Sequence, residues 1–72
     1  MSDLTPTQRK VAELVGAGAS YKEIGYSLGI QKTTARAHVN AIAAKLPDDE
    51  ITAYRRVMIW IIRQAIDRKK VG

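Results

Sequence analysis

Two predicted helices separated by only three residues constrain the fold of this chain more than any other feature. The first, residues 20–28, begins with Ser20 and Glu23 at the spacing of a capping box and ends at Gly29, which suits the left-handed conformation that terminates helices. The second, residues 32–46, ends before a proline. Helix, tight turn with glycine and helix is the order of a helix-turn-helix motif. Apolar residues recur along one side of the second helix: Ala35, Val39, Ile42 and Leu46.

One further helix is predicted on each side of this pair. Residues 5–8 (Thr-Pro-Thr-Gln) form a helix start with a threonine cap and a glutamine that closes a capping box, and Gly16 and Gly18 end that helix. The last helix spans residues 48–70, because the three carboxylates at 48–50 suit the positive end of a helix dipole. No stretch alternates polar and apolar residues for long enough to predict a strand.

The chain is therefore predicted to be all-α, a single four-helix, helix-turn-helix domain over residues 1–72. Its helix-turn-helix core covers residues 4–46, and a long C-terminal dimerisation helix covers residues 48–70. A domain of this length buries only about 60% of its unfolded surface, so a partner chain would help to stabilise it.

The composition excludes several kinds of chemistry. Cysteine is absent, which excludes disulfides, cysteine-ligated zinc and a thiol nucleophile, and one histidine cannot form a metal cluster. No catalytic constellation accompanies His38, so no enzyme, metal or cofactor is expected. The longest apolar run, residues 57–62, is far shorter than the roughly 20 residues that span a bilayer, and the N-terminus lacks a signal pattern. These features are typical of a cytoplasmic protein.

The charge balance indicates a polyanionic partner. Twelve Lys and Arg against seven Asp and Glu give a net charge of +5 and a pI near 9.9. Residues 1–46 carry six basic and three acidic groups, and residues 47–72 carry six and four, so the charge is spread over predicted helices rather than over a tail. Nucleic acid is the first candidate for such a charge.

The predicted helix over residues 32–46 carries a polar face that suits the major groove of DNA, which admits one helix. Arg36 can form two hydrogen bonds with guanine, Asn40 can pair with adenine, and Thr33 can reach a phosphate or a base. Lys32 mainly supplies charge, which makes the affinity depend on salt. The sequence thus predicts double-stranded DNA as the partner. The residues of this face lie apart from the apolar side: Lys32, Thr33, Arg36 and Asn40.

A set of residues with a particular spacing runs through most of the chain: Leu4-Thr5-Pro6, Val11, Gly18-Ala19-Ser20-Tyr21-Lys22-Glu23-Ile24, Leu28-Gly29-Ile30, Thr34-Ala35-Arg36-Ala37-His38-Val39, Ile42 and Lys45-Leu46. With this spacing, residues 4–62 resemble the LuxR/FixJ-type helix-turn-helix domain of bacterial transcription regulators. The resemblance implies a four-helix DNA-binding domain in which the second and third helices read DNA and the fourth commonly forms a homodimer contact. It also implies a bacterial or phage source and a stand-alone form without a sensor domain.

The resemblance also implies roles for single residues. Arg36, Ala37 and Asn40 match recognition-helix positions that usually touch bases or phosphates. Tyr21 and Lys22 match positions that often touch backbone phosphate. Thr34 and Lys45 match positions that frequently contact the DNA backbone or support the protein scaffold.

Two departures from the family pattern lie around the turn. Gly25 replaces a common Ala inside the helix over residues 20–28, where glycine costs about 1 kcal/mol relative to alanine. Two explanations for glycine at this position are open: close approach of a neighbouring helix, or sequence drift at a position that tolerates substitution. Gln31 replaces the usual Ser and is a poorer cap for the next helix.

The last helix is apolar over about half of its circumference by 100° geometry, which is more than one small core needs. This excess predicts one contact with the chain's own core and a second contact with another chain. A two-fold pairing would place two recognition helices about one turn of DNA apart. The predicted homodimer interface consists of Tyr54, Val57, Met58, Ile61, Ile62 and Ala65.

A sequence-specific, homodimeric transcription regulator is the function that these patterns favour. One alternative is an antagonist that pairs through its C-terminal helix with a larger regulator and blocks the DNA binding of that regulator. A second alternative, a basic amphipathic segment at residues 51–70 on a membrane surface, is disfavoured by the capped helices before it. Trp60 is either an exposed partner contact or a side chain folded over the helix surface.

Overall fold

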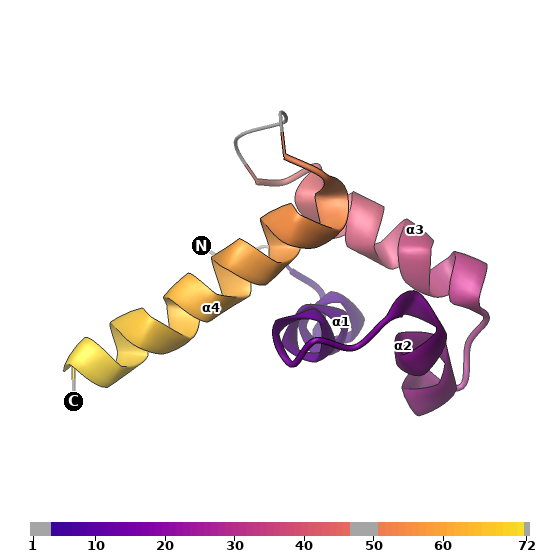
Figure 1. Ribbon diagram of the computed structural model, residues 1–72, viewed down its shortest axis with the longest axis horizontal. Helices are drawn as coiled ribbons and strands as arrows, with labels where there is room; N and C mark the ends of the chain where they lie inside the picture. Colours follow the sequence, from indigo (N-terminus) through magenta and orange to yellow (C-terminus); the bar gives the residue numbers. More distant parts are fainter. Residues whose placement is uncertain (1–3, 47–50, 72) are drawn as a thin grey trace.

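The structure, a computed structural model, describes residues 4–46 and 51–71, with side chains up to residue 67. It contains the helices α1 (Pro6–Gly16), α2 (Tyr21–Leu28), α3 (Lys32–Ala43) and α4 (Ala53–Val71). These described residues contain no strand, so the prediction of an all-α chain with four helices is confirmed. Helix α1 packs against α4 and α3, and α2 packs mainly on α3. Figure 1 shows α2 and α3 together at one end of the molecule, and the C-terminal part of α4 extends beyond the other helices at the opposite end.

Capping boxes form the first two helix starts, as the sequence predicts. Thr5 Oγ1 accepts a hydrogen bond from Gln8 N at 3.1 Å, and Gln8 Oε1 accepts one from Thr5 N at 3.2 Å. Ser20 and Glu23 form the same reciprocal pair, at 3.2 Å and 2.8 Å. Gly29 ends α2 with a φ of 70°. These bonds satisfy backbone groups that have no partner within a helix, so neighbouring residues set where α1 and α2 begin.

The prediction that the third helix reaches residue 46 is wrong, because α3 ends at Ala43. Lys45 N donates to Ile42 O, and Leu46 N donates to Ala43 O, both at 3.0 Å. Bonds over three residues tighten the chain into a turn. The proline at position 47 adds to this effect, since it disfavours helical backbone at the residue before it.

The start of the fourth helix also differs from the prediction, because α4 begins at Ala53 and both Ile51 and Thr52 precede it as non-helical residues. The three carboxylates that were expected to open this helix, at 48–50, lie outside the described residues.

Arg56 explains both of these helix ends. Its Nη1 donates to Ala43 O at 2.9 Å, and its Nη2 donates to Ile51 O at 2.7 Å. A cation on the last carbonyl of α3 is favourable, because that end of a helix carries partial negative charge. Since the same guanidinium holds Ile51 O, Ile51 stays outside the helix, and Thr52 O accepts the bond from Arg56 N at 2.9 Å. Arg56 therefore links the end of α3 to the start of α4.

The hydrophobic core is built from small aliphatic side chains on all four helices. The inward side of α3 is buried as predicted, and Leu46 lies half-buried at its edge. Val57 brings α4 into the same cluster with no exposed surface. The fully or almost fully buried residues are Val11, Ala12, Val15, Ile24, Ala35, Val39, Ile42, Ala43 and Val57.

Gly25 lies at the closest approach between α2 and the start of α3. A Cβ atom at this position would be 2.7 Å from Ile30 O and 3.3 Å from Lys32 N. Both atoms belong to backbone, which cannot move aside as the end of a side chain can. Close approach is therefore the reason for glycine here, and the close neighbour is the turn together with the first residue of α3.

We predict that Gly25→Ala lowers the free energy of unfolding by about 1–3 kcal/mol, the usual cost of an overpacked core. The loss outweighs the gain of about 1 kcal/mol in helix propensity, because the added methyl group collides with the backbone of the turn. Urea unfolding followed by circular dichroism measures the change.

Ser27→Ala is the matched control on the same helix, because Ser27 is exposed. Its stability is expected to stay within about 0.5 kcal/mol of the wild type. A Gly25→Ala chain as stable as the wild type would contradict the close approach.

Candidate nucleic-acid interface

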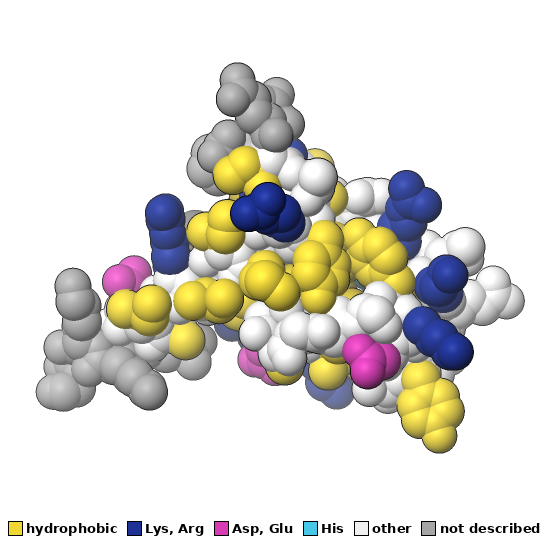
Figure 2. Space-filling model, viewed as in Figure 1, with side chains coloured by type: hydrophobic (Ala, Val, Ile, Leu, Met, Phe, Trp, Pro, Cys, Tyr) yellow, Lys and Arg dark blue, Asp and Glu magenta, His cyan; other side chains and the backbone are white. Residues whose placement is uncertain are grey.

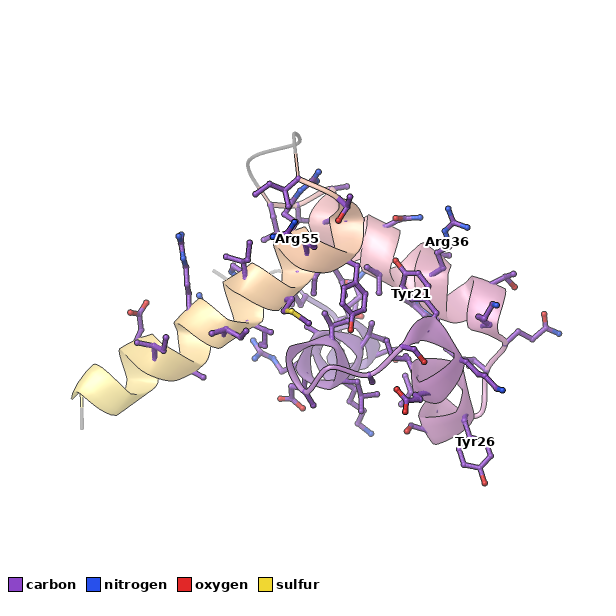
Figure 3. The ribbon with its side chains drawn as sticks, viewed as in Figure 1. Tyr21, Tyr26, Arg36 and Arg55 are labelled. Carbon is purple, nitrogen blue, oxygen red and sulfur yellow. The ribbon has the colours of Figure 1, made fainter. Side chains whose placement is uncertain are left out.

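The outward side of α3 is the candidate nucleic-acid interface. Figure 3 shows Arg36 pointing away from the body of the molecule. Within the described residues, the side chains of Arg36 and Asn40 make no hydrogen bond, so their donors are available to a base edge. Six of the predicted DNA contacts are exposed on this helix: Lys32, Thr33, Thr34, Arg36, Ala37 and Asn40.

Backbone bonds, rather than a capping side chain, hold the start of α3. Gln31 occupies the cap position, and its side chain makes no capping bond. Ile30 N donates to Gly25 O, and Ala35 N donates to Gln31 O, both at 2.9 Å. No acidic residue lies in the first turn of α3, where Lys32 is the first helical residue. A helix end of this kind favours an anion beside it.

The start of α2 is braced by α4. Tyr54 Oη donates to Ala19 O at 2.6 Å, and the Tyr54 ring meets the Tyr21 ring edge to face at 5.7 Å between centroids. Burial raises the pKa of Tyr54 above its ordinary 10.0, and the nearby Tyr21 and Glu23 raise it further. Tyr21 is half-buried by this packing, whereas Lys22 beside it is exposed. The two predicted phosphate contacts on α2 thus differ, with Tyr21 packed and Lys22 free to reach outward.

Lys45 lies in the turn after α3 rather than on the helix. Its Nζ donates to Gln8 Oε1 at 3.0 Å, so the side chain joins the end of α3 to the capping box of α1.

Positive charge gathers beside the outward side of α3. Figure 2 shows Lys and Arg side chains at the end of the molecule where α2 and α3 lie. Lys22, Lys32 and Arg36 are the exposed cations of these two helices. The predicted DNA contacts of α2 and α3 therefore share one basic region.

The inner side of α4 is used by the chain itself. Val57 is fully buried in the core, so its side chain offers no surface to a second chain. Tyr54, Met58 and Ile61 are half-buried and pack against the core. Trp60 is also half-buried against the core, which agrees with a side chain folded over the helix surface.

An exposed apolar stripe lies on the opposite side of α4 from Val57. Its members follow each other at offsets of three and four residues: Ile59 (36% exposed), Ile62 (42%) and Ile66 (53%). Figure 2 shows hydrophobic side chains in a row along α4. Ile62 and Ala65 belong to the predicted dimer interface and are exposed, whereas Ile59 and Ile66 lie outside that predicted set. Ile59 and Ile66 can be identified from the sequence, because helical periodicity places them about half a turn from Val57.

Across 4–46 and 51–71, no three His, Cys, Asp or Glu residues gather as metal ligands. Among the helices described, none has both the length and the apolar character to cross a membrane.

The fold and the exposed basic face define a helix-turn-helix DNA-binding domain. The chain belongs to the luxR family of bacterial regulatory proteins, because the family model described as GerE matches residues 2–58. The family binds DNA, regulates transcription and contains no enzymes. Comparisons with the curated proteins and with the solved structures found no match.

We predict that Tyr54→Phe lowers the free energy of unfolding by about 1 kcal/mol, the usual net value of one hydrogen bond. Folding favours the neutral phenol, whose pKa is raised. This contribution is therefore complete below the unfolded pKa of 10.0 and is lost as the pH rises through the folded pKa. Urea unfolding at about pH 8 and about pH 10.5 measures both effects, and the wild type should lose more stability between them than Tyr54→Phe.

Tyr26→Phe is the control, since Tyr26 is 91% exposed. It should follow the wild type at both pH values. Equal losses in the wild type and in Tyr54→Phe would show that the Tyr54 hydroxyl does not contribute to the pH dependence.

Proposed function

We propose that this chain is a sequence-specific transcription regulator that binds double-stranded DNA as a homodimer, with α3 in the major groove. The observation that carries the proposal is the division of α3 into two sides. Ala35 and Val39 are fully buried, while Arg36 and Asn40 are exposed and make no side-chain bond within the described residues. A helix that presents a forked cation and an amide above a rigid core suits direct base recognition.

The exposed stripe on α4 supports the homodimer. Ile59, Ile62 and Ile66 leave apolar surface in water, and their removal from water by a second copy is favourable. An interface with two-fold symmetry uses the same patch on both chains. A pairing of α4 with α4 of a second copy meets this condition. Two α3 helices then enter the major groove about one helical turn apart, roughly 34 Å along the duplex. The second copy uses the outer side of α4, since the inner side holds Val57 in the core.

We predict that Arg36→Ala reduces the preference for a selected duplex over a random duplex by about 1–3 kcal/mol, because the two bonds to a base are lost. Arg36→Lys keeps the charge without the fork, so it should lose the preference and retain the salt dependence. In vitro selection from random duplexes, followed by titrations at several salt concentrations, measures both quantities.

Lys10→Ala is the control for a lost positive charge, because Lys10 is exposed on α1 rather than on α2 or α3. An unchanged preference in Arg36→Ala would remove Arg36 from base recognition. A wild type that binds no duplex would exclude the proposed function.

We predict that Ile62→Asp converts the protein from dimer to monomer, because a carboxylate replaces an apolar side chain at the centre of the stripe. Sedimentation equilibrium measures the mass, and circular dichroism checks that the helices are retained. Binding to a two-fold symmetric duplex should weaken in parallel, since a monomer contacts only one half-site.

Gln64→Asp is the matched control, because Gln64 is exposed on α4 about half a turn away from Ile62. It should remain dimeric. A wild-type monomer that binds no DNA and instead pairs with a larger regulator would favour the antagonist over the homodimer.

A further inference from the structure

An open groove of about 250 Å³ lies between α1 and α4, beside the exposed apolar stripe on α4. Its lining comes from both helices: Glu13, Gly16, Ile61, Ile62, Gln64 and Ala65. Gly16 lets the two helices approach closely, because a Cβ atom there would be 2.6 Å from Ile61 Cγ2. Glu13 lies about one turn earlier on the same side of α1. The groove therefore combines apolar surface with one carboxylate.

Glu13 has no counterion in the part of the chain that the structure describes. Its side chain is exposed and forms neither an ion pair nor a hydrogen bond there. Arg63 on α4 is in the same state within those residues, and it does not line the groove. At about 100° per residue, Arg63 lies about 100° to one side of Ile62, and Ala65 lies about 60° to the other side. Arg63 and the groove with Glu13 therefore flank the stripe on opposite sides.

We propose that the groove of each chain holds Arg63 of a second copy, whose guanidinium pairs with Glu13, in a dimer whose two α4 helices run parallel. The inference rests on the proposed function, since it requires the homodimer. It extends the dimer interface from the outer side of α4 to α1, and it assigns a direction to the pairing.

The position of the proposed DNA-binding face selects the parallel pairing. In Figure 1, α2 and α3 lie at the end of the molecule opposite to the C-terminal part of α4. A two-fold axis that runs along α4 keeps both copies of α3 at the same end, where one duplex can reach both. An antiparallel pairing would place the two copies of α3 at opposite ends of the dimer.

The charges on α4 select the same direction. When two helices related by a two-fold axis run parallel, each flank of one helix meets the opposite flank of the other, and equal positions lie level. Arg63 of one copy then faces the Ala65 side of the other, at the level of the groove lined by residues 61–65. In an antiparallel pairing like flanks meet, so the two Arg63 side chains would repel each other. Two-fold symmetry forms the Glu13–Arg63 pair twice.

Charge reversal tests the pair, by sedimentation equilibrium of the protein without DNA. Glu13→Arg and Arg63→Glu should each raise the dissociation constant of the dimer about tenfold, because two attractive contacts become repulsive. The double variant restores opposite charges, so its dissociation constant should return to within about threefold of the wild type. Ser27→Arg is the control and should leave the constant unchanged, because Ser27 is exposed on α2 and does not line the groove. Circular dichroism checks that each variant is folded.

Cysteine cross-linking tests the direction of the pairing, since the chain has no cysteine of its own. Ile59→Cys and Ile66→Cys should each form a disulfide-linked dimer with a second copy of the same variant, because equal positions meet in a parallel pair. A disulfide that forms only in a mixture of the two variants would show an antiparallel pairing and overturn the inference.

A double reversal that associates as weakly as the single variants would also overturn the inference. The proposed homodimer would survive both results if Ile62→Asp still became monomeric. A wild type that is monomeric at every concentration would remove the homodimer and this inference together.

Discussion

The backbone contact between Gly25 and the turn is the constraint on which the proposed DNA-binding face depends. Ile30 N donates to Gly25 O at 2.9 Å, and the absent side chain lets the start of α3 pass close to α2. Because Gln31 makes no capping bond, this backbone packing rather than a side chain fixes the direction of α3. The same packing decides which side of α3 is buried, and so it decides that Arg36 lies on the exposed side.

Two polar contacts connect this helix pair to α4. Arg56 joins α4 to the last carbonyl of α3, and Tyr54 joins α4 to Ala19 just before α2. With Val57 between them in sequence and fully buried, the inner side of α4 is committed to the chain's own fold. A second chain on the outer side of α4 would therefore be held in a fixed orientation relative to the DNA-binding face. A rigid connection of this kind is what a fixed spacing between two DNA half-sites requires.

The sequence predicts the features that neighbouring residues determine and misses those that distant residues determine. The capping boxes at Thr5 and Ser20, and the end of α2 at Gly29, depend on residues three or four positions apart, and the structure has them as predicted. The end of α3 and the start of α4 depend on Arg56, whose carbonyl partners lie five and thirteen residues away. The exposed side of α3 follows from helical periodicity. The apolar arc of α4 is so wide that the sequence does not show which part of it faces the core. Only the packing in the structure shows that Val57 faces inward and that Ile62 faces outward.

The positions of the lysines indicate that stability and DNA binding oppose each other at the helix starts. Glu23 lies in the first turn of α2, but α3 has no acidic residue there and begins with Lys32. A carboxylate near Lys32 would strengthen the start of α3 and would also repel phosphate. Lysine does the reverse: it weakens the free helix and would strengthen the helix in the proposed complex with DNA. An anion that binds at this end therefore stabilises the fold as well as the complex, since a ligand that binds only the native state raises its stability. The weak cap at Gln31 has the same two effects: it lowers the stability of the free helix and favours a bound anion. The N–H groups that the Gln31 side chain leaves unpaired are donors for a phosphate oxygen.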